Sequence, residues 1–223
     1  MANRPVFIPK QDGKQLVEVK YIDFEWFAGL HYSQKQKSIR SLHDAFLKES
    51  PCAQILEVSS KSENTLGIDL SAFNLIYNSQ NNKDISVEAI FQSSKVFSKG
   101  GPYKDILEKN SKDAKRDERL RTSGALISFE CDSVNWELEP KTAFYDWIYL
   151  NALDKNSHLK KQVLVYDAFT DIEFNPKKSI NCQAYSLALY VSLVKRNLDV
   201  TKIISEKKSY LSLIESFLGY GVD

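Results

Sequence analysis

Two apolar segments in the second half of the sequence constrain the fold most. Residues 140–153 repeat apolar side chains at the spacing of an α-helix, with Pro140 in a position that favours a first turn. Residues 179–196 are strongly apolar, and we expect a helix to begin near Ser179. Helices with so little polar surface are buried, so both predict a substantial core. The apolar positions of the first segment are Ala143, Phe144, Trp147, Ile148, Leu150 and Leu153.

The N-terminal part of the chain follows a different pattern. Residues 1–30 alternate between apolar and polar side chains, which is typical of strands in an antiparallel sheet, and residues 33–50 have helical spacing. We therefore predict a helix-rich α+β fold with one globular domain and a small antiparallel sheet. Residues 1–60 are expected to pack on a core of residues 61–200 as a strand and helix extension, and residues 201–223 to form a helical tail.

Composition excludes several classes of protein. The chain has 223 residues and a formal net charge of +1, so no global field gathers nucleic acid or anionic membranes. Cys52, Cys131 and Cys182 are widely spaced and suggest neither a disulfide framework nor a metal site. No apolar run approaches the length of a membrane span, and the first residues do not resemble a secretory signal. We expect a cytoplasmic protein that needs no metal or cofactor.

A line of polar residues crosses the otherwise apolar segment SVEAIFQSSKVF, residues 86–97. If the whole segment is one helix, Glu88, Gln92 and Lys95 fall within an arc of about 60°. A narrow polar line on an apolar helix is typical of groups that face a cavity. The alternative is a surface stripe in which the three side chains support the helix.

The segment YDAFTDIEFNPKKSINCQ, residues 166–183, is the second polar group. Carboxylates, the pair Lys177 and Lys178, and the N–H groups of a helix beginning near Ser179 or Asn181 could converge there and bind an anion or a sugar. A capped surface loop explains the same residues. The charge run that follows the break at Gly100, Gly101 and Pro102 and ends at Gly124 is interpreted as a solvated face.

Several of these segments, in this order and spacing, resemble the NADAR, or YbiA-like, family. They are LSAFN (70–74), SVEAIFQSSKVF (86–97), AKRDERLR (114–121), Trp136 and TDIEFNPKKSINCQAYSLAL (170–189). The segments LEVSSKS and EPKTAFYDWIYLNAL extend the likeness to one branch, the NADAR antitoxins that accompany DarT-type toxins. The resemblance implies a YbiA-like domain that removes ADP-ribose from guanine bases of DNA.

The resemblance also implies roles for particular residues. Glu88 and Asp171 are expected near the ribose C1, where positive charge develops when an N-glycosidic bond breaks. Lys95 is either a cation that donates a proton or an amine that forms a Schiff base with ribose. Gln92 is expected to orient a substrate group. The remaining candidates for substrate binding are Ser71, Phe73, Lys177, Lys178 and Asn181, with Trp136 or Phe174 stacking on a base.

The implied partners are ADP-ribosylated guanine in single-stranded DNA, ADP-ribose as product and a cognate DarT-type toxin. Two other functions stay open at this point. The chain could be an N-glycosidase of riboflavin-pathway intermediates, as other members of the family are. It could also be a non-enzymatic antitoxin that binds and blocks its toxin.

Overall fold

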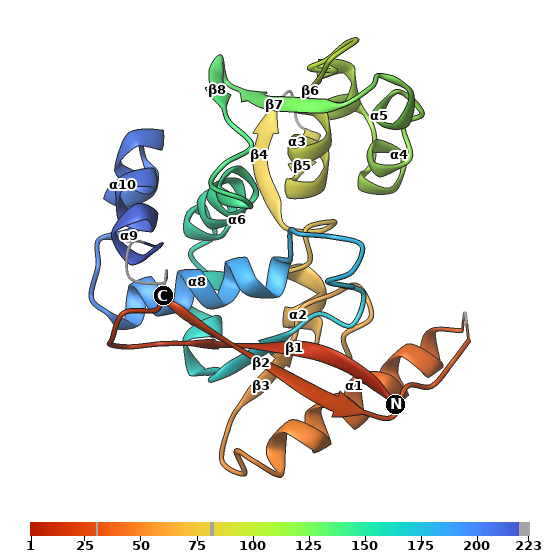
Figure 1. The fold of residues 1–223 in the computed structure, drawn as a ribbon, viewed down its shortest axis with the longest axis vertical. Coiled ribbons are helices and arrows are strands. Elements are labelled where there is room, and N and C mark those ends of the chain that lie inside the picture. Colours follow the sequence, from red (N-terminus) through yellow and green to blue (C-terminus); the bar gives the residue numbers. More distant parts are fainter. Residues whose placement is uncertain (30, 81–82, 219–223) are drawn as a thin grey trace.

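The computed structural model describes residues 1–29, 31–80 and 83–218, and its first sheet has the strand order β2-β1-β9-β3 (Figure 1). Strands β1 (Ala2–Pro9) and β2 (Val17–Phe24) form an antiparallel hairpin. Strand β9 (Ala168–Thr170) lies antiparallel to β1 but parallel to β3 (Ile55–Glu57). The predicted strands of an antiparallel sheet are confirmed for β1 and β2, and the parallel pair makes the sheet mixed.

The two faces of this sheet belong to different parts of the core. Side chains alternate along β1, so Val6 packs with helix α1 (Tyr32–Leu47) while Phe7 packs with the cluster that contains α8. Buried Ile39, Leu42 and Phe46 form the inner stripe of α1. Figure 1 shows α1 and α8 on opposite sides of the strands.

Helices α6 (Ala143–Lys155) and α8 (Gln183–Lys195) confirm the two apolar segments as core helices and pack against each other. Their predicted starts were wrong. Pro140 precedes α6 rather than opening it, because Thr142 adopts a left-handed φ of 67° directly before the first helical residue. Ser179 also lies outside its helix.

The start of α8 is delayed by a separate turn. The carbonyl of Asn175 accepts hydrogen bonds from the amides of Lys178 and Ser179, at 2.9 Å each. These bonds fold residues 175–179 on themselves, so the helix begins only after Cys182. The loop that joins β9 to α8 is therefore longer than the sequence predicted.

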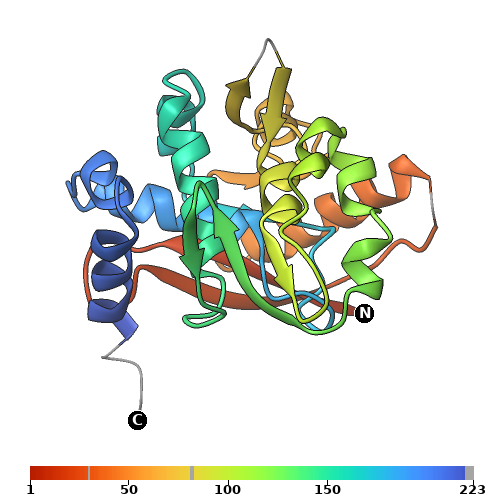
Figure 2. The ribbon, with the colours of Figure 1, turned by 90° about the horizontal axis from the view of Figure 1, so that it is seen from above.

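Two smaller sheets lie beyond α6. One pairs β4 (Ile76–Gln80) with β5 (Lys83–Ser86), and the other has the order β6-β7-β8. Helix α3 connects them, running directly from β5 into β6. Figure 2 shows the β7–β8 hairpin, with α4 and α5 on one side of it and α9 and α10 on the other. The bounds of these elements are α3 Val87–Ser93, β6 Lys95–Phe97, β7 Leu126–Cys131, β8 Val134–Trp136, α4 Ser111–Lys115, α5 Arg119–Thr122, α9 Val200–Ile204 and α10 Lys207–Leu218.

The remaining short elements are α2 Thr65–Asp69, the 3-10 helix η1 Lys104–Glu108, α7 Leu159–Gln162 and the 3-10 helix η2 Val163–Val165. Together the elements form one globular α+β unit, as predicted from the sequence. Within the described residues, no helix has the length and apolar character needed to cross a membrane. Residues 219–223 of the predicted helical tail lie outside the described residues.

Candidate active site

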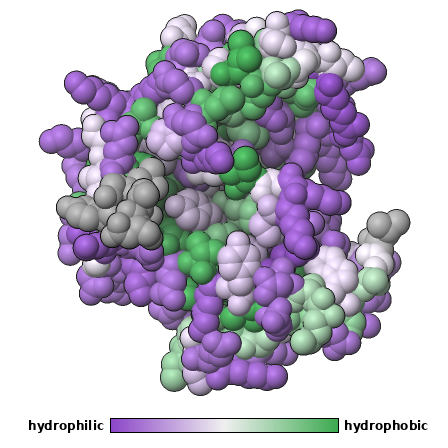
Figure 3. Space-filling view, viewed as in Figure 1, coloured by the Kyte–Doolittle hydropathy of each residue, from purple (hydrophilic) through white to green (hydrophobic). Residues whose placement is uncertain are grey.

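A cavity of about 730 Å³ lies between α3, α4, the start of α6 and the loop that joins β9 to α8. Pockets for small ligands commonly have volumes of roughly 300–1,000 Å³, so this one can hold a nucleotide-sized molecule. The face drawn in Figure 3 is mostly hydrophilic, with small groups of apolar residues around a hollow near its centre. Polar residues of the wall include Glu88, Gln92, Lys95, Lys115 and Asp171.

Helix α3 places the first three of these residues, although it is shorter than predicted. It ends at Ser93, because the hydroxyls of Ser93 and Ser94 both donate to the carbonyl of Ile90. Lys95 therefore belongs to β6, where it pairs with Phe129 of β7. The prediction of one helix over residues 86–97 was wrong.

The polar line itself is nevertheless a chain of hydrogen bonds. Gln92 Nε2 donates to Glu88 Oε1 at 2.9 Å, and Lys95 Nζ donates to Gln92 Oε1 at 2.7 Å. Glu88 and Gln92 are each 5% exposed, so neither is a solvated surface residue. The amide of Gln92 thus fixes the acid and the amine at a set separation on the cavity wall.

Burial changes the chemistry of Lys95. Desolvation lowers the pKa of its ammonium to about 8, with a smaller opposing effect from Glu88 and a further lowering from Lys115. Its Nζ lies 4.6 Å from the ring centroid of Phe91. A substantial fraction of Lys95 is therefore the neutral amine near pH 8, which is the form that acts as a nucleophile.

Lys115 of α4 is a site residue that the sequence did not assign. Its Nζ lies 3.7 Å from Glu88 Oε1 and 5.0 Å from the ring centroid of Phe73, so it lines the cavity beside α3. The charge run around it was interpreted as a solvated face. This interpretation is correct for its neighbour Lys112, because that side chain is exposed and does not line the cavity. The one available signal was the AKRDERLR segment of the family resemblance.

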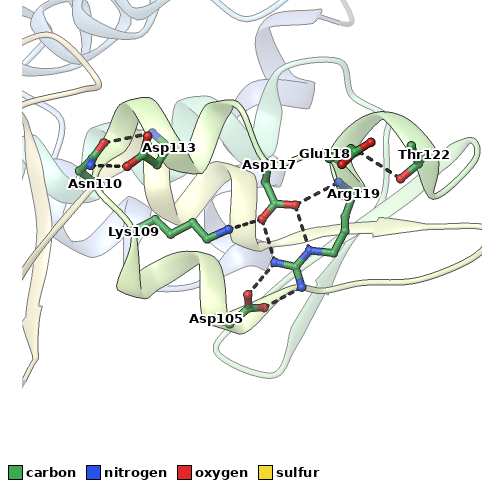
Figure 4. A network of polar contacts seen from close by, with 8 residues as sticks. All are labelled: Asp105, Lys109, Asn110, Asp113, Asp117, Glu118, Arg119 and Thr122. Atoms are coloured by element: carbon green, nitrogen blue, oxygen red, sulfur yellow. Dashed lines mark hydrogen bonds and ion pairs between the residues drawn. The ribbon is translucent and has the colours of Figure 1, made fainter.

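A network of ion pairs holds the segment that carries Lys115 (Figure 4). The guanidinium of Arg119 donates to both carboxylate oxygens of Asp117 and to both of Asp105. Lys109 adds a bond of 2.6 Å to Asp117. Because these contacts tie η1, α4 and α5 together, the charge run is in part an internal scaffold for the cavity wall.

Asp171 enters the cavity from the loop after β9. Its Oδ1 accepts hydrogen bonds from the amides of Glu173 at 2.9 Å and Phe174 at 3.2 Å. The side chain is buried, and this burial, followed by the negative charge of Glu57, raises its pKa well above that of an ordinary aspartate. Asp171 is therefore poised to carry a proton.

The other predicted substrate-binding residues divide into two groups. Phe73, Phe174, Lys178 and Asn181 line the cavity. Ser71, Trp136 and Lys177 do not.

Trp136 shows why an aromatic residue in a motif need not stack on a ligand. It is 1% exposed, and its ring lies 5.0 Å from that of Trp147 and 5.5 Å from that of Phe144, measured between centroids. Trp136 is therefore a core residue that supports the start of α6. Ser71 is likewise buried, at 1% exposure, whereas Lys177 is exposed on the outside of its loop.

Tyr145 of α6 is a second residue that sequence reasoning missed. It lines the cavity, and its ring packs edge-on against Phe91 at 5.1 Å between centroids. Its hydroxyl forms no hydrogen bond with any other described residue. Burial raises the pKa of this phenol, and the charges of Glu88 and Asp171 raise it further. Tyr145 therefore adds a neutral hydroxyl to the wall of the cavity that also contains the two acids.

Comparison with known proteins identifies the family of the chain. No curated protein matches the chain. A family model, described as the DarT1-associated NADAR antitoxin, matches residues 2–219. The match includes the segments that carry α3, α4 and the β9–α8 loop, and it confirms the resemblance seen in the sequence motifs. The chain belongs to the family of DarT1-associated NADAR antitoxins.

Proposed function

We propose that this antitoxin is an ADP-ribosylguanine glycohydrolase, which removes ADP-ribose from guanine bases of DNA. The family match supports an antitoxin role and a DarT-type toxin as the partner. The observation that carries the enzymatic proposal is the hydrogen-bonded chain from Glu88 through Gln92 to Lys95, on the wall of the same cavity as Asp171. Cleavage of an N-glycosidic bond is suited by three such groups: an acid, an amine that is partly neutral, and a second acid whose protonated form is favoured.

The reaction breaks the bond between the ribose C1 and the exocyclic amine of guanine. The neutral amine of Lys95 adds to C1, the C1–N bond breaks, and the departing amine takes up a proton. The ribose ring opens to give a Schiff base on Lys95, which water hydrolyses to free ADP-ribose and the lysine amine. Glu88 supplies the negative charge that stabilises the positive charge developing at C1.

The rest of the cavity matches the remaining parts of ADP-ribose. Lys115 and Lys178 supply cations for the pyrophosphate. Phe73 and Phe174 supply aromatic surface for the adenine or guanine ring. Lys115 lies beside both Glu88 and Phe73, so one cation borders the proposed ribose and base positions.

Two substrates distinguish the proposed activity from its enzymatic alternative. The protein is incubated with a single-stranded oligonucleotide that carries ADP-ribosylated guanine, and separately with a riboflavin-pathway N-glycoside. We expect release of ADP-ribose from the oligonucleotide, measured by chromatography. Cleavage of the riboflavin intermediate alone would overturn the proposal.

A matched pair of variants distinguishes catalysis from toxin sequestration. Glu88→Gln removes the acid from the cavity, whereas Glu118→Gln changes an exposed acid outside it. We expect the first to lower the rate by about 10²- to 10⁴-fold and the second to leave it unchanged. In cells that express the toxin, folded Glu88→Gln protein should not protect; full protection by it would show that the antitoxin acts by binding alone.

A further inference from the structure

A second buried acid lies behind Asp171. Glu57, at the end of β3, is 2% exposed and pairs with Thr170 in the parallel register of β3 and β9. Its Oε2 accepts a hydrogen bond from Thr170 Oγ1 at 2.7 Å, and its Oε1 accepts one from the amide of Ile172 at 2.8 Å. The residues before and after Asp171 are therefore both held by this one carboxylate.

Burial raises the pKa of Glu57, whereas its hydrogen-bond donors act in the opposite direction and favour its ionised form. Ser59 adds a third donor, with its Oγ 2.6 Å from Glu57 Oε1. His43 Nε2 lies 2.8 Å from Thr170 Oγ1, and burial lowers the pKa of this imidazole to about 4, so the ring is neutral. Because the hydroxyl of Thr170 donates to Glu57, its oxygen accepts from His43. Glu57 thus acts only as an acceptor, and the bond from His43 reaches it through Thr170.

Among the described residues, the side chain of Asp171 accepts hydrogen bonds only from two backbone amides, and no cationic side chain forms an ion pair with it. Glu173, on the same loop, already pairs with Lys35 of α1 at 3.2 Å. The other titratable groups that face Asp171 are neutral or negative: Glu57 of β3, Tyr145 and Tyr149 of α6, and Cys182 before α8. Because the charge of Glu57 raises the pKa of Asp171, the two buried carboxyls favour a state with one negative charge between them.

We propose that Glu57 is a positioning residue that keeps Asp171 protonated, so that Asp171 is the acid that protonates the departing guanine amine. This inference rests on the proposed glycohydrolase activity. Oδ1 of Asp171 is occupied by two backbone amides, whereas no other described residue binds Oδ2, so Oδ2 carries the proton. As the C1–N bond breaks, the Oδ2–H bond breaks and an N–H bond forms. Solvent then returns a proton to Asp171.

The two acids of the cavity thereby have different roles. Glu88 accepts a hydrogen bond from Gln92 and pairs with Lys115, so it is held where it can supply negative charge beside C1. Asp171 has the buried anion of Glu57 as a neighbour, and this negative charge favours the neutral form of Asp171. Environments that separate two carboxyls in this way assign the acid and the charge-stabilising group.

The test compares Glu57→Gln, which removes the charge at nearly constant volume, with Thr170→Val, which removes a hydrogen bond and leaves the charge. The rate of each full-length variant is divided by the wild-type rate at pH values from 5 to 8. For Glu57→Gln we expect this ratio to fall about tenfold as the pH rises, because Asp171 loses its proton more readily. For Thr170→Val the ratio should be the same at every pH. A pH-independent ratio for Glu57→Gln would overturn the inference.

A second readout does not depend on catalysis. Nuclear magnetic resonance of the aspartate carboxyl carbons follows the titration of Asp171 in wild type, in Glu57→Gln and, for assignment, in Asp171→Asn. We expect Asp171 to titrate above the range of exposed aspartates in wild type and at lower pH in Glu57→Gln. Titration of wild-type Asp171 in the ordinary range would overturn the inference even if Glu57→Gln fails to fold. A wild-type protein that releases no ADP-ribose contradicts the proposed function instead.

Discussion

Lys115 Nζ lies 3.7 Å from Glu88 Oε1, and this contact brings the charged helix α4 to the wall of the cavity. The side chain of Lys115 is 57% exposed, so the pair is screened by water and contributes little to folding stability. Lys115 therefore contributes little to the fold. Because it lies beside an acid in the cavity, its charge is placed to act on a bound ligand.

Replacement of Lys115 by alanine should therefore lower activity without affecting stability. We expect kcat/KM for ADP-ribosylated DNA to fall roughly 10- to 100-fold, since a charge-assisted hydrogen bond is worth about 1.5–3 kcal/mol. The melting temperature should not change. Lys112→Ala, on the same helix but outside the cavity, is the matched control and should retain full activity. Equal losses in both variants would mean that Lys115 acts only through general surface charge.

Lys95 should form a covalent intermediate that borohydride can trap. Reduction of its Schiff base during turnover would leave a stable adduct, which peptide mass spectrometry would locate at Lys95. Because the pKa of Lys95 is about 8, the amine is mainly protonated at lower pH, and the yield of adduct should fall as the pH drops from 8 to 6. Lys95→Arg should give no adduct, and the exposed control Lys99→Arg should behave as wild type. An active enzyme without any adduct would assign Lys95 the role of a cation.

Two tyrosines on α6 offer a test that separates binding from stability. Tyr149 donates to the carbonyl of Leu70 at 2.7 Å, so Tyr149→Phe leaves a buried acceptor unpaired and should cost about 1–3 kcal/mol of unfolding free energy. Tyr145 has no such partner among the described residues, so Tyr145→Phe should be as stable as wild type. If its hydroxyl binds substrate, the same change should lower kcat/KM about tenfold. Urea unfolding and steady-state kinetics of both variants measure the contrast, and unchanged kinetics for Tyr145→Phe would exclude this role.

Asp146 should make stability depend on pH. Its side chain accepts hydrogen bonds from Thr142 and Ser186 at 2.6 Å each, and burial raises its pKa to about 7. A raised pKa means that the folded state favours the protonated acid, so this stabilisation is present at low pH and is lost as the pH rises through 7. From pH 5 to pH 8, the unfolding free energy of wild type should fall relative to Asp146→Asn by about 2 kcal/mol. Urea unfolding at both values measures this difference, and a constant difference would contradict it.

The helices that bury most of their surface could be predicted from the sequence, because a helix formed by a long run of apolar residues has to be buried. The hairpin of β1 and β2 was also predictable, since alternation along a strand follows from the geometry of its side chains. The ends of these elements were not. Local bonds decide them: two serine hydroxyls end α3 at Ser93, and the turn at Asn175 delays α8.

The residues that meet at the cavity were only partly predictable. Glu88 and Gln92 are one helical turn apart, so their contact follows from spacing. Lys115 comes from a segment whose charge predicts a solvated surface, and Tyr145 from a segment whose apolar spacing predicts a buried helix. Only the tertiary fold turns these two side chains toward the cavity. Glu57 is 115 residues from the amide of Ile172 that it binds, so no local sequence pattern could predict this hydrogen bond.

The position of β9 between β1 and β3 also has a consequence for synthesis on the ribosome. When the first 165 residues have been made, β1 and β3 exist, but the strand that joins them does not. The segment that carries Asp171 then fills this gap, and its loop is anchored only when Glu57 reaches partners 113 and 115 residues later in the chain. Nascent chains that end before β9 therefore lack the loop that forms one wall of the cavity.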